Sequence, residues 1–122
     1  MQPTHFVLFA VARPEASARF YERLLQRPPV EVSPTFAMFA LGEGLMLGLW
    51  DREGMQPAVT VQPGASELAF VLADDKAVDA LHARWAADGV TIAQAPTRMD
   101  FGYTCVGIDP DGHRLRAFAP GA

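Results

Sequence analysis

Two arginines and a phenylalanine alternate after a tight turn near the end of the chain. The segment DPDGHRLRAF covers residues 109–118, and its Asp-Pro-Asp-Gly run is typical of a turn. In a strand after this turn, Arg114, Arg116 and Phe118 would share one face, because side chains alternate across a sheet. A guanidinium group can hold a carboxylate through two hydrogen bonds or stack on a flat ring. We therefore expect this face to form one wall of a pocket for an organic ligand.

The first half of the chain contains the elements of a small α+β unit. Apolar patterning predicts a strand at 5–11, a helix at 14–27 and a hairpin of two strands at 35–41 and 45–50. Pro28 and Pro29 end the helix, and Gly42-Glu43-Gly44 marks the hairpin turn.

The second half repeats this order of elements. Its patterning predicts a strand at 67–73, a helix at 74–89, an edge strand at 90–96 and two strands at 101–108 and 113–118. Asp74 or Asp75 can cap the helix, and Gly89 stands where a terminating glycine belongs.

The two halves can be aligned with each other. Phe9 then matches Phe70, and Trp50 matches Phe118, with apolar positions coinciding between them. The sequence therefore predicts a single α+β domain, 1–122, made of two βαβββ units. We expect the units at roughly 1–52 and 66–120, with residues 53–65 as a linker.

Composition excludes several classes of protein. With 122 residues, a net charge of −4 and scattered arginines, the chain gives no reason to expect nucleic acid as a partner. No apolar stretch approaches the roughly 18 residues of a membrane span, and the N-terminus lacks a basic signal-peptide region. A single cysteine, Cys105, excludes an internal disulfide and fits a reducing compartment. We expect a cytoplasmic protein without a membrane partner.

The chain resembles the vicinal oxygen chelate superfamily, which includes glyoxalases, extradiol dioxygenases and bleomycin-type resistance proteins. Two βαβββ units, SARFYERLL after the first strand and DPDGHRLRAF at the end carry the resemblance, which covers nearly the whole chain. It implies that the units curl into a mixed sheet with a concave cavity. It also implies a homodimer with the cavity at or near the subunit interface.

Metalloenzymes of this superfamily place His, Gln or Glu at four inward positions. Carried over, these positions fall on Phe6, Gly48, Glu67 and Arg116. One carboxylate is too few for a divalent ion, and a permanently charged arginine would repel it. His5 is adjacent to Phe6 but points to the opposite face of a strand. We therefore expect no metal and no other cofactor.

Alternation places a mixture of aromatic, sulfur-containing and charged residues on the concave face. Such a face suits a flat, partly polar small molecule. We expect Gly48 to leave space for a ligand and Arg116 to anchor it. The candidate ligand-binding residues are Phe6, Phe36, Met38, Met46, Gly48, Trp50, Glu67, Phe101, Tyr103 and Arg116, and Cys105 and Gly107 are assigned to the same face.

Within the superfamily the chain is most similar to metal-free drug-binding proteins that confer resistance to phenazine antibiotics. Residues 27–51 and 95–118 carry this similarity. It implies a protein that sequesters a planar aromatic molecule, with Trp50 as the stacking residue and no catalytic residues.

Whether the protein is an enzyme stays open at this stage. A lyase or isomerase could use Glu67 as general base, with a pKa raised by burial. A dimeric interaction module with a vestigial cavity is a third alternative. Trp50 could serve only dimer packing, and Glu67 and Arg116 could simply neutralise each other.

Overall fold

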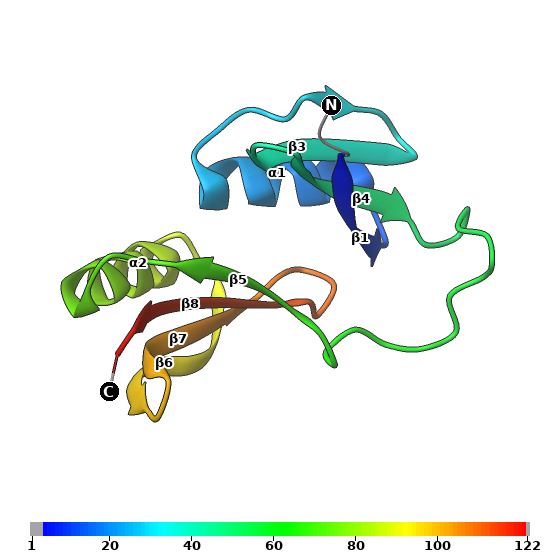
Figure 1. Ribbon diagram of the computed structural model, residues 1–122. Helices are drawn as coiled ribbons and strands as arrows, with labels where there is room; N and C mark the ends of the chain where they lie inside the picture. The colour runs from blue at the N-terminus through cyan, green and yellow to red at the C-terminus, as the bar shows by residue number, and fades with distance from the viewer. Residues whose placement is uncertain (1–3, 122) are drawn as a thin grey trace. The chain divides into compact units, whose positions relative to one another are not determined.

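The protein is described by a computed structural model that covers residues 4–121 (Figure 1). It divides into two compact units, residues 1–61 and 62–122, and the division falls inside the predicted linker. Each unit holds a four-stranded mixed sheet and a helix, which confirms the predicted α+β class. Residues 1–3 and 122, the ends of the predicted domain, lie outside the described residues. Between residues 4 and 121, neither helix has the length and apolarity needed to cross a membrane.

The first unit has the strand order β1-β4-β3-β2, in which β1 runs parallel to β4 and the other pairs are antiparallel. Its elements are β1 (His5–Val11), α1 (Pro14–Leu25), β2 (Glu31–Val32), β3 (Phe36–Gly42) and β4 (Leu45–Asp51). Strand β2 is a two-residue edge strand, which the βαβββ order requires but which no local pattern marks.

Helix α1 covers one face of the first sheet. Pro14 occupies its first turn, and Ala18, Tyr21 and Leu24 are buried. The helix ends at Leu25, before the two prolines, because Gln26 adopts a left-handed conformation with φ 55°. The rings of Tyr21 and Phe39 are 6.4 Å apart, which identifies the helix-covered face of the sheet.

The second unit repeats this architecture with the strand order β5-β8-β7-β6. Its elements are β5 (Glu67–Val71), α2 (Asp75–Ala87), β6 (Thr91–Met99), β7 (Gly102–Ile108) and β8 (Arg114–Pro120). Strand β6 lies at the edge, as predicted, but it continues past Pro96 to Met99. A shift of register between Gln94 and Thr97 lets the edge strand accommodate a residue that has no N–H.

Helix α2 begins and ends as its sequence predicts. The Asp74 carboxylate accepts a hydrogen bond from the N–H of Ala77 at 2.8 Å, and Gly89 has a φ of 83°. Val78 and Trp85 are buried against the sheet, whereas Leu81 is only half-buried.

The turn before β8 is held by a buried carboxylate. Asp109 accepts hydrogen bonds from the N–H groups of Asp111 and His113 at 2.9 and 2.8 Å. Gly112 has a φ of 103°, a conformation that favours glycine. The DPDGH segment therefore forms the turn that leads into β8, the strand that carries both arginines.

Candidate functional site

The uncovered face of the first sheet carries the residues predicted for it. We call the sheet face opposite the helix the open face of each unit. Phe6 lies beside Met46 and Leu8 beside Gly48 in the β1–β4 ladder. Phe36 pairs with Trp50 and Met38 with Gly48 between β3 and β4, so alternation places all of these side chains on the open face.

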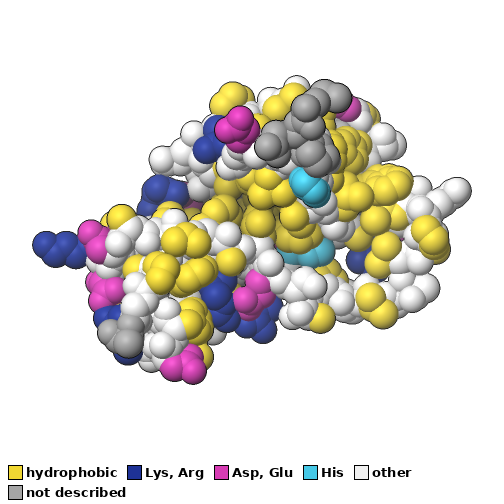
Figure 2. Space-filling view, in the orientation of Figure 1, with side chains coloured by type: hydrophobic (Ala, Val, Ile, Leu, Met, Phe, Trp, Pro, Cys, Tyr) yellow, Lys and Arg dark blue, Asp and Glu magenta, His cyan; other side chains and the backbone are white. Residues whose placement is uncertain are grey.

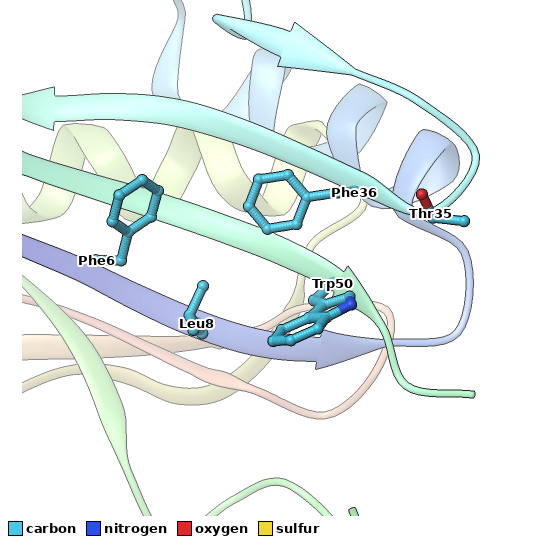
Figure 3. Close-up of a pocket in the computed structure, with 5 residues that line it drawn as sticks. All are labelled: Phe6, Leu8, Thr35, Phe36 and Trp50. Carbon is cyan, nitrogen blue, oxygen red and sulfur yellow. The ribbon is translucent and has the colours of Figure 1, made fainter. Parts of the chain in front are cut away.

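A pocket of about 500 Å³ lies on this face, and Figure 3 shows the side chains that line it. They are Phe6, Leu8, Thr35, Phe36 and Trp50. Phe6 and Leu8 are 46% and 47% exposed, which is unusual for side chains of this size. Hydrophobic side chains reach the surface over this unit in Figure 2. The polar groups of the lining side chains are the Thr35 hydroxyl and the Trp50 indole N–H.

Three of the predicted ligand-binding residues line this pocket. Phe6, Phe36 and Trp50 come together, whereas Met38 and Met46 share the face without lining the pocket. Thr35 was missed because the predicted strand 35–41 includes it, and alternation there turns it away from Phe36, whereas β3 begins only at Phe36. Ser33 accepts hydrogen bonds from the N–H groups of Thr35 and Phe36 at 3.3 and 3.1 Å, so the chain bends there and strict alternation does not apply.

Gly48 does not leave room for a ligand, contrary to the prediction. A Cβ on this residue would lie 2.7 Å from Leu8 Cδ2 and 2.9 Å from Phe36 Cζ. These two side chains already occupy the space above the glycine. Gly48 therefore lets Leu8 and Phe36 meet over the middle strand and form the floor of the pocket.

The open face of the second sheet carries an ion-pair cluster. Arg116 donates from Nε to Glu67 Oε1 at 2.8 Å and from Nη2 to Oε2 at 3.1 Å. Arg114 Nη2 lies 2.7 Å from Glu67 Oε2. The hydrogen bond from Arg116 lowers the pKa of Glu67 below its ordinary value. The expectation that burial raises this pKa toward that of a general base is therefore wrong.

Arg116 is almost fully engaged within the protein. Its Nη1 donates to Thr104 Oγ1 at 3.1 Å and to Gln94 Oε1 at 3.3 Å, and the side chain is 17% exposed. Its guanidinium lies 5.8 Å from the centre of the Phe101 ring. Arg116 thus holds the cluster together and has few N–H groups left for a ligand.

The alternation of side chains predicted for residues 101–108 is broken at Gly102, the first residue of β7. Phe101 stays on the open face, where its ring packs edge-on against Phe118 at 5.6 Å. Gly102 has a φ of 150°, and a Cβ there would lie 2.1 Å from the Ala119 carbonyl oxygen. After this kink, Tyr103 faces the helix and its hydroxyl donates to Asp79 at 2.7 Å.

The face assignments after Gly102 are therefore corrected by one residue. Tyr103, Cys105 and Gly107 lie on the helix-covered face, where a Cβ on Gly107 would touch Trp85. Cys105 is fully buried, and burial raises the pKa of its thiol, so it is a core residue. The open face instead carries Thr104, Val106 and Ile108.

The four positions at which the family resemblance implies metal ligands do not fit a divalent ion in this chain. Phe6 and Gly48 offer no donor atom, and the Glu67 carboxylate is already bound by two guanidinium groups. His5 pairs with Leu45 on the other face of the sheet. Over residues 4–121, no three His, Cys, Asp or Glu side chains cluster closely enough to hold an ion.

Comparison with known proteins agrees with this architecture. The model of the Glyoxalase/Bleomycin resistance protein/Dioxygenase superfamily matches residues 3–117. The phenazine antibiotic resistance protein EhpR of Enterobacter agglomerans is 29% identical over 112 residues, which are 89% of this chain and 85% of EhpR.

Solved structures are similar over the whole length. Protein ATC0852 from Agrobacterium tumefaciens is 45% identical with a TM-score of 0.88, and the match covers 100% of both chains. A glyoxalase-related enzyme from Fulvimarina pelagi is 27% identical with a TM-score of 0.85, over 98% of this chain and 88% of the other. The chain belongs to the glyoxalase/bleomycin resistance protein/dioxygenase superfamily.

Proposed function

We propose that the protein binds and sequesters a planar aromatic small molecule of the phenazine antibiotic class, without a metal. The observation that carries this proposal is the pocket of the first unit, where Phe6, Phe36 and Trp50 meet from three adjacent strands. Similarity to a protein named for phenazine antibiotic resistance supports the choice of ligand class.

The pocket offers favourable energetics for a flat apolar ligand. Stacked or edge-on contacts between aromatic rings contribute about 0.5–1.5 kcal/mol each beyond the burial of their area. Phe6 and Leu8 expose apolar surface to water, and a ligand that covers them would remove that surface. The volume of about 500 Å³ is in the range of small-molecule pockets.

The lining side chains favour binding over chemistry. Phe6, Leu8, Thr35, Phe36 and Trp50 contain no group that exchanges a proton near neutral pH. On the second sheet, Glu67 is the candidate general base, but its pKa is lowered and its carboxylate is bound by two arginines. Sequestration would therefore be stoichiometric, with one binding site in each first unit.

The proposal includes a homodimer that acts in the cytoplasm. Apolar residues on both open faces are exposed, including Val71 at 66% and Phe101 at 41%, and a second copy would cover such surface. The free, buried Cys105 supports a reducing compartment. Light scattering after size-exclusion chromatography would give the mass: twice that of the chain supports the dimer, and that of a single chain contradicts it.

Tryptophan fluorescence tests the binding proposal, because the chain has two tryptophans in different surroundings. Trp50 lines the pocket, whereas Trp85 is 1% exposed in the core of the second unit. In Trp85→Phe, saturable quenching by phenazine should persist. Calorimetric titration should show phenazine affinity about two- to tenfold lower in Trp50→Ala, the loss of roughly one stacking contact. Unchanged affinity in Trp50→Ala would contradict the proposal.

A further inference from the structure

The second open face contains an arginine with hydrogen-bonding capacity to spare. A guanidinium group has five N–H donors. Arg114 uses Nη2 to bind Glu67 at 2.7 Å, and its side chain is 40% exposed. Its Nε is buried and makes no hydrogen bond with the described residues, so the donors left for a ligand are the Nη1 and Nη2 N–H groups that Glu67 does not use. Glu67 therefore satisfies this guanidinium only in part.

The cluster also carries excess positive charge. Glu67 is ionised at neutral pH, since its pKa is lowered, and it faces two permanently charged arginines. Arg116 binds both oxygens of the carboxylate and two further acceptors. The three side chains together thus carry one more positive charge than negative charge.

This charge borders a pocket of about 440 Å³ in the second unit. Arg114 and Arg116 form its cationic part, and Gln94 adds an amide. Val106, Ile108 and Met99 give it apolar walls. None of the described residues that line it is a carboxylate, and the Glu67 carboxylate beside Arg114 is bound by both guanidinium groups.

We infer that this pocket binds a small organic carboxylate, with its carboxylate group on the Nη N–H groups of Arg114 that Glu67 leaves unused and its apolar body against Met99 and Ile108. Arg116 acts as a positioning residue: through Glu67 it holds Arg114 in place. A charge-assisted hydrogen bond from arginine is stronger than a neutral one. The apolar walls favour an organic acid over an inorganic anion of similar charge. This inference concerns the second unit alone and stands independently of the aromatic pocket in the first.

Titration with benzoate and its neutral analogue benzamide tests the inference. The readouts are the NMR signals of the Arg114 guanidinium N–H groups and of the Met99 and Ile108 methyl groups. In the wild-type protein, benzoate should shift these signals saturably. Benzamide should bind at least about tenfold more weakly, as expected for loss of a charge-assisted contact. Equal affinities for the two probes, or no saturable shift with benzoate, would overturn the inference.

Two arginine variants locate the site. Arg114→Gln removes the excess positive charge of the cluster and should weaken benzoate binding at least about tenfold, by the same reasoning. Arg98→Gln is the matched control, because Arg98 is an exposed arginine of the same unit that pairs with Asp75 and does not line the pocket. Backbone NMR spectra would establish that both variants are folded. Wild-type affinity in Arg114→Gln, or an equal loss in Arg98→Gln, would overturn the assignment.

A third variant separates this inference from the proposed function. Trp50→Ala should leave the benzoate-induced shifts unchanged, even though it weakens binding of phenazine. Loss of the shifts in Trp50→Ala would place benzoate in the aromatic pocket and overturn the inference. Failure of phenazine to bind, with benzoate still shifting Arg114, would instead contradict only the proposed function.

Discussion

Glu67 and Arg116 lie on adjacent parallel strands and are joined diagonally by two hydrogen bonds. Ala69 is the residue directly beside Arg116 in the ladder, yet the guanidinium reaches back to Glu67 with Nε–Oε1 and Nη2–Oε2 distances of 2.8 and 3.1 Å. The same carboxylate binds Arg114. One acidic residue therefore orders two cations on the open face of the second unit.

The first prediction concerns the pH dependence of stability. Replacing Glu67 with Gln leaves both arginines without their carboxylate and should lower the free energy of unfolding by about 0.5–1.5 kcal/mol near neutral pH, since solvent screens these partly exposed pairs. Because pairing lowers the pKa of Glu67 below 4.5, its contribution is complete above the unfolded pKa and is lost as pH falls through the folded one. Urea denaturation of wild type and Glu67→Gln across the acid range should show the difference shrinking. A difference that stays constant down to strongly acidic pH would contradict this account.

The second prediction concerns the floor of the aromatic pocket. Gly48→Ala places a methyl group against Leu8 and Phe36, which must move, and should destabilise the protein by about 1–3 kcal/mol. It should also weaken phenazine binding, because the two displaced side chains line the pocket. Gly42→Ala is the matched control, since a Cβ there meets no atom within 4 Å. Thermal denaturation and calorimetry would measure both effects, and equal behaviour of the two variants would contradict the packing described.

The third prediction concerns the kink that reverses the faces of β7. Gly102→Ala combines an unfavourable φ of 150° with a clash against the backbone at Ala119. It should destabilise the protein by more than about 2 kcal/mol, in the severe range for single substitutions. Gly54→Ala, whose added Cβ would make an ordinary 3.7 Å contact, should change the free energy of unfolding little. Chemical denaturation would measure the free energy of unfolding of both variants. A Gly102→Ala variant as stable as the wild type would contradict the kink.

The fourth prediction concerns Tyr103, which lies away from the open face. Tyr103→Phe should leave phenazine affinity unchanged, whereas Phe36→Ala should lower it, and calorimetry would compare the two. The hydrogen bond to Asp79 raises the pKa of Tyr103. Removing that acceptor in Asp79→Ala should therefore lower the pKa, as followed by tyrosinate absorbance. Reduced phenazine affinity in Tyr103→Phe would indicate that this side chain reaches the ligand after all.

Local patterns predicted most of the fold. Period-2 alternation in β1, β3 and β4 gave the correct faces for Phe6, Phe36 and Trp50, because these strands are regular where the residues lie. Turn and capping residues such as Asp74 and Gly89 also behaved as expected, since their roles depend on near neighbours in the chain.

The errors arose where tertiary contacts override local pattern. The phase of β7 depends on Gly102, whose close approach to Ala119 involves residues 17 positions apart in sequence. The filling of the space above Gly48 depends on side chains from two other strands. The distribution of hydrogen bonds between Arg114 and Arg116 likewise follows from three-dimensional geometry, which alternation alone does not specify.

The central claim is that the first open face binds a planar aromatic ligand without a metal. A crystal structure of the protein with phenazine, grown in the presence of a chelator, tests it most directly. We expect the phenazine ring to pack against Trp50 and Phe36, with no metal ion within coordinating distance of the ligand. A ring bound away from these two residues, or density for an ion held by Glu67 in crystals grown without chelator, would contradict the account.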